Sequence, residues 1–284
     1  MKKQGLKKIK KLIELCFLNR LWGSAAELTY YLLFAFFPFL MFLVGAFSLI
    51  GGEEGSLIQQ TAQWLPEQVQ SLLSEYSTYL YSMPGSMPLI LGGAMTLYSL
   101  TRAFHVLGFH IRRIYGRTRR RKLWHDFRQS GIFTLAFMVL ILLNFGLIVC
   151  GRFFLTLLDR FTSITQGLLT VMEVGRFAVP MALGFFFVLH LYHFLPGGEF
   201  KLRQALPGTV FCMLGWGGAT ILFSFYMDGF ARYSLLYGSV SAAVMLVVWL
   251  NLTSMLLLFG AQINVLLLPK EKSRNGKGSG EVTS

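Results

Sequence analysis

Six long apolar segments restrict the fold of this 284-residue chain more than any other feature. Each is close to or above the ~20 residues that a helix needs to cross a hydrocarbon layer about 30 Å thick. Lipid offers no hydrogen-bond partner to an open backbone, so a segment that crosses must be helical. The sequence therefore predicts an all-α integral membrane protein with six transmembrane helices, at about residues 28–50, 87–109, 132–150, 175–195, 206–227 and 239–267.

The composition supports the same class. Only 14% of the residues are charged and 54% are hydrophobic, whereas about 25% of the residues of a soluble domain are charged. The first apolar stretch is longer than the roughly 7–15 residues of a signal-peptide core. We therefore expect it to remain in the protein as the first span.

Lysine and arginine are concentrated in alternate loops. Most of the 26 basic residues lie in four segments: residues 1–27, 110–131, 196–205 and 269–284. Positively charged loops stay on the cytoplasmic side of a membrane. The sequence therefore predicts that both termini are cytoplasmic, and this topology accounts for the net charge of +13.

Three segments outside the spans have their own character. Residues 1–27 predict a basic amphipathic helix on the cytoplasmic face. Residues 51–86 combine glutamates with apolar residues at helical spacing, which predicts an amphipathic outer helix between the first and second spans. Residues 269–284 predict a disordered cytoplasmic tail. The six-span membrane domain then occupies residues 28–268.

The basic loop between the second and third spans supports two interpretations. Arginines interleaved with aromatic residues can stack on nucleic-acid bases, but the topology already requires a positive loop here. We favour contact with lipid headgroups and predict no nucleic-acid partner. The residues predicted for headgroup contact are Arg112, Arg113, Arg119, Arg120, Arg121 and Lys122.

The motifs of common enzyme classes are missing from the sequence. There is no phosphate-binding loop, paired-cysteine zinc site or HExxH motif, and no nucleophile elbow. The 13 acidic residues are scattered, whereas a nuclease needs clustered metal ligands. His190 and His193 share a helical face, but no further ligands accompany them, so we interpret them as interfacial. We predict no enzyme activity, no catalytic residues, no metal, no cofactor and three unpaired cysteines.

Glu27 and Arg102 are charged residues at similar depth in the first and second spans. The first span enters from the cytoplasm and the second returns, so both residues lie toward the inner face. An unpaired charge deep in a span costs about 2.5–3.5 kcal/mol on insertion scales. One prediction is an intramembrane ion pair between the two helices. The alternative is that each side chain reaches the headgroups separately.

Polar and helix-breaking residues predict a substrate pathway among the first, second and sixth spans. Pro38 removes a backbone donor, so we expect it to kink or interrupt the first span. Broken helices often line transport sites, although ordinary kinks are commoner. Asn251 falls near mid-membrane and should face the bundle or a wet cavity, with an interhelical hydrogen bond as the alternative. The predicted pathway residues are Tyr30, Pro38, Asn251, Gln262 and Asn264.

Small residues in the last two spans predict close helix contacts. Gly260 and Ala261 interrupt the polar half of the last span, and the fifth span contains the stretch GWGGAT at residues 215–220. Without a side chain at these positions, two helix backbones can approach closely.

Three stretches, AELTYYLLFAFFPFLMFLVGAFSLIG, YHFLPGGEFKLRQALPGTVF and YGSVSAAVMLVVWLNLTSMLLLFGAQIN, resemble regions of the YihY/virulence-factor BrkB family of bacterial inner-membrane proteins. Their order and spacing extend the resemblance over about residues 15–268. It implies a six-helix membrane protein linked to serum resistance and to envelope lipid or lipopolysaccharide export. Some members carry a ribonuclease label that is generally regarded as a misassignment. The family more often has a glutamate at the position of Gln262, and Glu27 is less typical of it.

Residues and resemblance together favour a transporter or exporter of lipid or another envelope-related substrate in the bacterial inner membrane. The expected partners are membrane lipids and a small or lipid substrate, and the sequence specifies no oligomeric state. Without an ATP-binding motif, pumping would use an ion gradient or a partner protein. The alternative is a non-transporting scaffold or envelope assembly factor, and a nuclease is disfavoured.

Overall fold

The computed structural model describes residues 14–49, 87–117, 123–161, 166–197, 200–237 and 239–268. Six long helices form most of this part of the chain: α2 (Leu21–Leu49), α5 (Met87–Ile114), α6 (Leu123–Phe161), α7 (Gln166–Phe194), α8 (Leu202–Tyr237) and α9 (Ser239–Leu267). The described ranges contain no β-strand, in agreement with the all-α prediction. The predicted outer helix, the tail and most of the N-terminal helix lie outside them.

Length and composition show which helices can cross a membrane. Four described segments are long and apolar enough: Leu21–Leu43, Trp124–Asn144, Leu202–Phe225 and Ala243–Leu267. α7 adds a shorter apolar stretch, Ala178–Phe194. The chain is therefore an all-α membrane protein. The count of six crossings and the cytoplasmic termini stay predictions.

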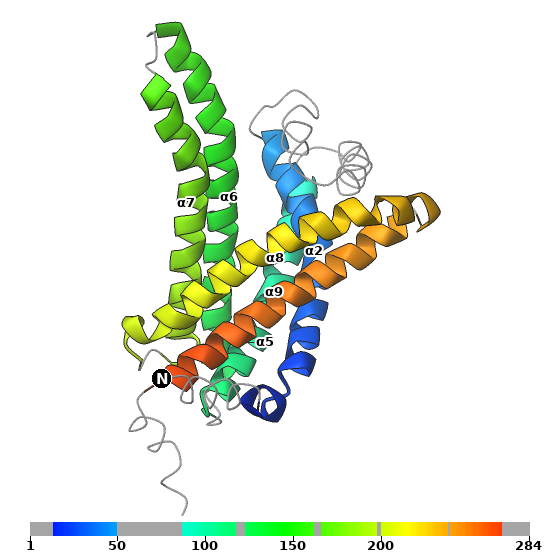
Figure 1. The fold of residues 1–284 in the computed structure, drawn as a ribbon, viewed down its shortest axis with the longest axis vertical. Coiled ribbons are helices and arrows are strands. Elements are labelled where there is room, and N and C mark those ends of the chain that lie inside the picture. Colours follow the sequence, from blue (N-terminus) through cyan, green and yellow to red (C-terminus); the bar gives the residue numbers. More distant parts are fainter. Residues whose placement is uncertain are drawn as a thin grey trace, which may run out of the picture.

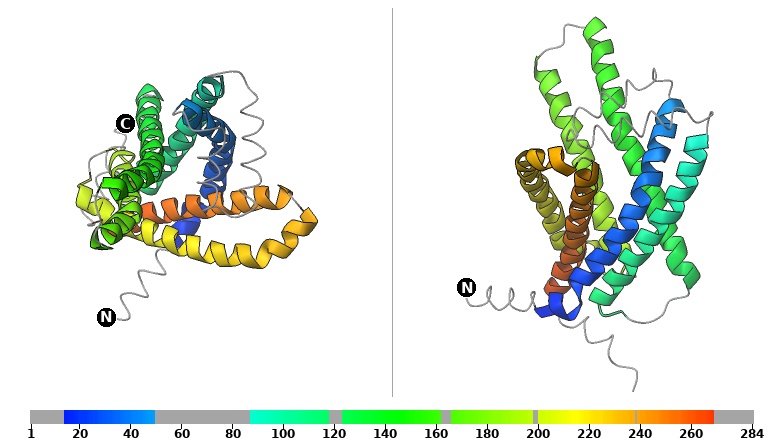
Figure 2. Two further views of the ribbon diagram at one scale, coloured as in Figure 1. Left: turned by 90° about the horizontal axis from the view of Figure 1, so that it is seen from above. Right: turned by 90° about the vertical axis from the view of Figure 1, so that its right-hand side faces the viewer.

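The helices form three hairpins, α2–α5, α6–α7 and α8–α9, which meet at one end of the molecule and separate toward the other (Figure 1). The view from the side shows the same divergence of the α6–α7 and α8–α9 hairpins from α2 and α5 (Figure 2). We call the end where they meet the basic end, because it carries Arg112, Arg113, Arg117, Lys201 and Arg203.

The main hydrophobic core lies at the basic end. Its members come from the N-terminal parts of α2, α6 and α8, from the C-terminal parts of α5, α7 and α9, and from Cys16 in the short helix before α2. The largest fully buried apolar side chains are Leu28, Ile111, Leu191, Tyr192, Leu195 and Leu258. Many large apolar side chains elsewhere are exposed, such as Leu214 and Leu222 of α8, as expected for helices that face lipid.

The α2–α5 hairpin is also tightly packed at the opposite end. A Cβ atom at Gly45 would lie 2.5 Å from the Leu89 amide nitrogen, and one at Gly92 would lie 2.5 Å from the Phe42 amide nitrogen. Only glycine permits such contact between two helix backbones. These two helices are therefore in contact from one end of the hairpin to the other.

Pro38 lies inside α2 without ending it, since the helix is continuous from Leu21 to Leu49. The predicted interruption of the first span therefore does not occur. A proline removes one intrahelical hydrogen bond, and packing against neighbouring helices can compensate for that loss within a membrane.

Candidate functional site: polar contacts along α9

α9 carries polar groups that reach four other segments of the chain. Its partners are α2, the turn before α2, α7 and α8. We call this set of contacts the α9 network. The sequence had indicated that the polar side chains of the last span face the bundle, and the contacts below place them there.

The contact with α2 lies nearest the middle of α9. Asn251 Nδ2 donates to Thr29 Oγ1 over 3.2 Å, and Thr29 Oγ1 lies 3.3 Å from Ser254 Oγ. Thr29 and Ser254 are buried, whereas Asn251 is half-buried. For Asn251, the structure therefore has the interhelical hydrogen bond that the sequence left as an alternative.

Gln262 joins α9 to the turn that precedes α2. Asn19 Nδ2 donates to Gln262 Oε1 over 2.8 Å, and Gln262 is fully buried. Arg20 follows with φ of 49°, in the left-handed region, which turns the chain from the short helix at residues 14–18 into α2. Among the described residues, Gln262 Nε2 has no hydrogen-bond partner.

Asn264 joins α9 to the beginning of α8. The backbone amide of Gly208 donates to Asn264 Oδ1 over 2.6 Å, and both residues are buried. Pro207 directly precedes this amide, and a proline disturbs the local ladder of helix hydrogen bonds. An amide near the start of α8 is thereby bonded to another helix.

Gly208 and Gly260 form the crossing point of α8 and α9. A Cβ atom on Gly208 would collide with the Gly260 carbonyl oxygen and would lie 2.6 Å from Asn264 Nδ2. A Cβ atom on Gly260 would collide with the Tyr192 hydroxyl. The predicted close contact at Gly260 is confirmed. In the GWGGAT stretch, Gly215 approaches Leu256, whereas Gly217 and Gly218 face open space.

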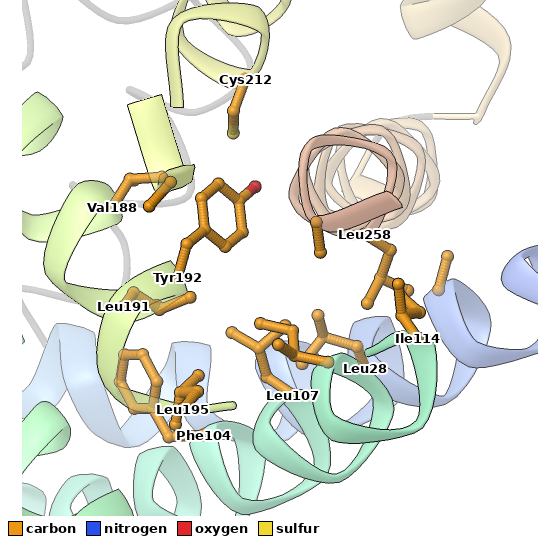
Figure 3. Close-up of a cluster of buried hydrophobic side chains, with 14 of the residues drawn as sticks. Leu28, Phe104, Leu107, Ile114, Val188, Leu191, Tyr192, Leu195, Cys212 and Leu258 are labelled. Atoms are coloured by element: carbon orange, nitrogen blue, oxygen red, sulfur yellow. The ribbon is translucent and has the colours of Figure 1, made fainter. Parts of the chain in front are cut away.

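Tyr192 is the residue of this site that sequence reasoning missed. Its hydroxyl donates to the Leu257 carbonyl over 2.7 Å, and its side chain is 1% exposed. Figure 3 shows the ring pointing from α7 toward α9, with the Cys212 sulfur of α8 turned toward the hydroxyl. The sequence could have indicated Tyr192, because a tyrosine hydroxyl inside an apolar span requires a hydrogen-bond partner.

The turn after α5 closes the site at the basic end. The Tyr115 ring lies 5.0 Å from the Phe200 ring, and the Arg117 guanidinium lies over the Phe200 ring, 5.0 Å from its centroid. Burial raises the pKa of Tyr115 to about 12, and an interaction with Asn264 opposes the shift. The Tyr115 hydroxyl therefore stays protonated at neutral pH.

The predicted ion pair between Glu27 and Arg102 is wrong. Glu27 Oε2 lies 2.9 Å from His110 Nε2, two turns further along α5. Arg102 is exposed, with its guanidinium 5.8 Å from the Tyr98 ring and 5.7 Å from the Phe127 ring. The premise of equal depth was therefore wrong, since Glu27 lies beside His110, and Arg102 also lies on a different face of α5 from the one that packs against α2.

The basic loop is also more structured than predicted. Arg112 Nη2 lies 3.1 Å from Asp126 Oδ2, and both side chains are 11% exposed, so Arg112 binds a carboxylate of α6 instead of a lipid headgroup. Arg113 is exposed. Residues 119–122 lie outside the described ranges.

The histidines and cysteines show no metal or disulfide chemistry in the described part of the chain. His190 Nδ1 donates to the Phe186 carbonyl of its own helix over 2.7 Å. Within the described ranges, no three His, Cys, Asp or Glu residues form a metal-binding group. Cys16 and Cys212 are free and buried, and the side chain of Cys150 is outside the described set.

The five predicted pathway residues do not gather at one point. Tyr30 is 64% exposed and packs edge-to-face on Tyr31. Asn251, Gln262 and Asn264 each bond to a different segment, along roughly 20 Å of α9 at 1.5 Å per residue. Chemically, the arrangement joins helices through neutral hydrogen bonds. It is suited to holding the basic end closed, since each bond would have to break for α9 to move.

Comparison with known proteins places the chain among bacterial membrane proteins. A family model described as virulence factor BrkB matches residues 18–281. The ribonuclease-like protein YfkH of Bacillus subtilis (strain 168) is 28% identical over 88% of this chain and 91% of its own length. A UPF0761 membrane protein of Chromohalobacter salexigens is 24% identical over 84% of this chain and 58% of its own length. No solved structure matches.

Proposed function

The chain belongs to the virulence factor BrkB family, and from that premise we propose that it is a transporter or exporter of lipid or another envelope-related substrate. In this proposal the six helices cross the bacterial inner membrane, and the basic end and both termini face the cytoplasm. The protein acts without catalysis of its own. The distribution of basic residues supports the orientation.

The observation that carries the proposal is the unequal packing of the two ends. The three hairpins share one buried core at the basic end and diverge toward the opposite end (Figure 1). A carrier alternates between states that open to one face and then to the other. In the proposed cycle, this structure would be the state closed at the cytoplasmic face, with the α9 network as part of the closure.

The α9 network is suited to a closure that opens. Its bonds are single and neutral, and each is worth on average ~0.6 kcal/mol between membrane helices. Glycines at the α8–α9 crossing leave the two backbones in direct contact. No side chain at the crossing therefore has to move out of the way when the two helices shift. For the basic end to open, these few hydrogen bonds must break and be replaced by hydrogen bonds to water or to the substrate.

Reconstitution into liposomes tests transport directly. We expect the purified protein to move a fluorescent phospholipid between leaflets faster than empty liposomes do. Replacement of Asn251 by Leu should change the rate. Replacement of Thr253 by Val is the matched control, because within the described ranges Thr253 bonds only to the Trp249 carbonyl of its own helix. Lipid movement at the empty-liposome rate would favour the scaffold alternative.

Labelling in intact cells tests the orientation independently. An impermeant maleimide should modify a cysteine at Gln60→Cys and leave one at Thr283→Cys unmodified until the membrane is opened. Labelling of both, or of Thr283→Cys alone, would contradict the proposed topology.

A further inference from the structure

Arg102 occupies a face of α5 that is turned away from the bundle. Tyr98 and Phe109, on the same helical stripe, are 58% and 54% exposed, and Arg102 is exposed as well. A cation on a lipid-facing stripe is costly unless it reaches polar groups. Its position therefore requires a physical explanation.

Two aromatic rings from different helices hold the guanidinium. Its carbon lies 5.8 Å from the Tyr98 centroid on α5 and 5.7 Å from the Phe127 centroid on α6. Both distances are within the ~6 Å range of cation–π attraction. These rings interact with the guanidinium group and restrain its position, but they accept none of its five N–H donors in ordinary hydrogen bonds.

Among the described residues, no carboxylate pairs with Arg102. The two ion pairs found there join Glu27 to His110 and Asp126 to Arg112. Asp126, the acidic neighbour of Phe127, is therefore already neutralised by another arginine. The surface around Arg102 keeps a positive charge, and Arg128 adds a second exposed cation on the neighbouring helix.

The depth of Arg102 matches the inner headgroup region. A crossing of ~20 residues that begins at Met87 ends near residue 106, about 6 Å along the helix from Arg102. An arginine side chain spans that distance by extending toward the interface. Trp124, at the beginning of α6, is 81% exposed, and tryptophan is typical of this interfacial layer.

We propose that Arg102, with Tyr98 and Phe127, binds the phosphate of an anionic phospholipid of the cytoplasmic leaflet on the outer surface of α5 and α6. The guanidinium N–H groups bind the phosphate oxygens, and the rings hold the guanidinium in place. The proposal rests on the proposed crossing of α5. It concerns a resident lipid outside the bundle, so it is separate from transport of any substrate.

Native mass spectrometry of the full-length protein tests this site. The probes are phosphatidylglycerol and phosphatidylcholine, each added to the delipidated protein in detergent. We expect selective retention of phosphatidylglycerol by the wild type and about tenfold weaker retention by Arg102→Gln, the loss expected for a charge-assisted hydrogen bond. Arg203→Gln, which removes an exposed arginine of α8, should retain the lipid as the wild type does.

Two further measurements show whether the bound phosphate belongs to a lipid and whether the aromatic ring of Phe127 contributes to binding. Inorganic phosphate at matched ionic strength should not displace the lipid or protect the protein from heat. Phe127→Leu should lower retention by a smaller factor than Arg102→Gln, with unchanged elution on size exclusion. Equal loss in Arg102→Gln and Arg203→Gln, undiminished retention in Arg102→Gln, or equal protection by inorganic phosphate would overturn the proposal. None of these outcomes depends on a transport assay.

Discussion

The α2–α5 and α8–α9 hairpins both use glycine to bring two helices together, but at different places. In α2–α5, Gly45 and Gly92 lie far from the basic end, while Leu28 and Ile111 pack at the basic end. In α8–α9, the crossing of Gly208 and Gly260 lies at the basic end. The first hairpin therefore has its glycine contacts far from the basic end, and the second has its glycine crossing at the basic end.

This difference shows where each hairpin has no room for a side chain. The α8–α9 hairpin is also connected at the end away from the basic end, because α8 ends at Tyr237 and α9 begins at Ser239. Trp249 of α9 packs against Trp216 and Phe223 of α8 between these two points. The positions of the glycine contacts thus predict where an added methyl group will push each pair of helices apart.

The largest expected effect is the loss of the α8–α9 crossing in Gly208→Ala. The added methyl group collides with the Gly260 carbonyl oxygen, and overpacking of this kind costs about 3 kcal/mol at its upper range. Thermal unfolding in detergent, followed by size-exclusion fluorescence, measures the loss. Gly218→Ala is the matched control and should be neutral or slightly stabilising, because alanine favours helix. Equal unfolding temperatures for the two variants would refute the crossing.

A smaller loss is expected at the far end of α2–α5. In Gly92→Ala the methyl group meets the Phe42 amide nitrogen and the Met41 backbone, at a cost of about 2 kcal/mol. Gly23→Ala, where nothing lies within 4 Å, is the control. The effects of Gly92→Ala and Gly208→Ala should add, because separate sites contribute independently. Strong coupling in the double variant would mean that the hairpins are not separate units.

Asn264→Leu should cause the next largest loss of stability. It removes the acceptor of the Gly208 amide and leaves a buried donor unpaired, which costs about 1–3 kcal/mol. Asn251→Leu breaks a longer bond of a half-buried residue and should cost only ~0.6 kcal/mol, the average for membrane helices. The unfolding temperatures of the two variants measure these losses. A larger loss in Asn251→Leu than in Asn264→Leu would mean that the strongest bond of α9 lies at mid-membrane.

The smallest effect concerns Glu27. A double-mutant cycle with Glu27→Gln and His110→Gln should show coupling of about a few tenths of a kcal/mol, because Glu27 is 51% exposed and water screens its interaction with His110. The same cycle with Arg102→Gln should show none. Coupling in the second cycle and not in the first would restore the ion pair predicted from the sequence.

His110 also gives this pair a pH dependence. Burial lowers its pKa below the ordinary 6.5, and Glu27 opposes the shift. The unfolded chain therefore binds a proton at His110 at a higher pH than the folded protein does. The neutral imidazole therefore contributes its full share to the stability of the folded protein above pH 6.5. This contribution is lost as the pH falls through the pKa that His110 has in the folded protein. Between pH 7.5 and 5.5, the wild type should lose more thermal stability than His110→Gln.

The fold class was predictable from the sequence because apolar length and backbone hydrogen bonding leave only helices. The inward position of Ser254, Gln262 and Asn264 was predictable for a related reason, since polar groups avoid lipid. Gly260 was found because small residues mark close helix contacts. Each inference depends on one helix alone.

Partner choice was not predictable, because it depends on how two helices are shifted along their axes and rotated about them. The sequence placed Glu27 and Arg102 at similar depth, but Glu27 meets His110 two turns further along α5. Arg102 follows the exposed stripe of Tyr98 and Phe109. The Gly208 amide was hidden for another reason: no side-chain pattern marks a backbone donor. Tyr192 lay between two histidines that attracted the metal interpretation.

The order of synthesis gives the α9 network a consequence for assembly. Ribosomes release α9 last, so Thr29, Asn19, the Tyr192 hydroxyl and the Gly208 amide are all made before the groups that bond to them. Until α9 inserts, the earlier hairpins have these polar groups without their final partners. A chain cut short before residue 251 thus lacks every one of these bonds, and completion of the last helix joins α2, α7 and α8 through α9.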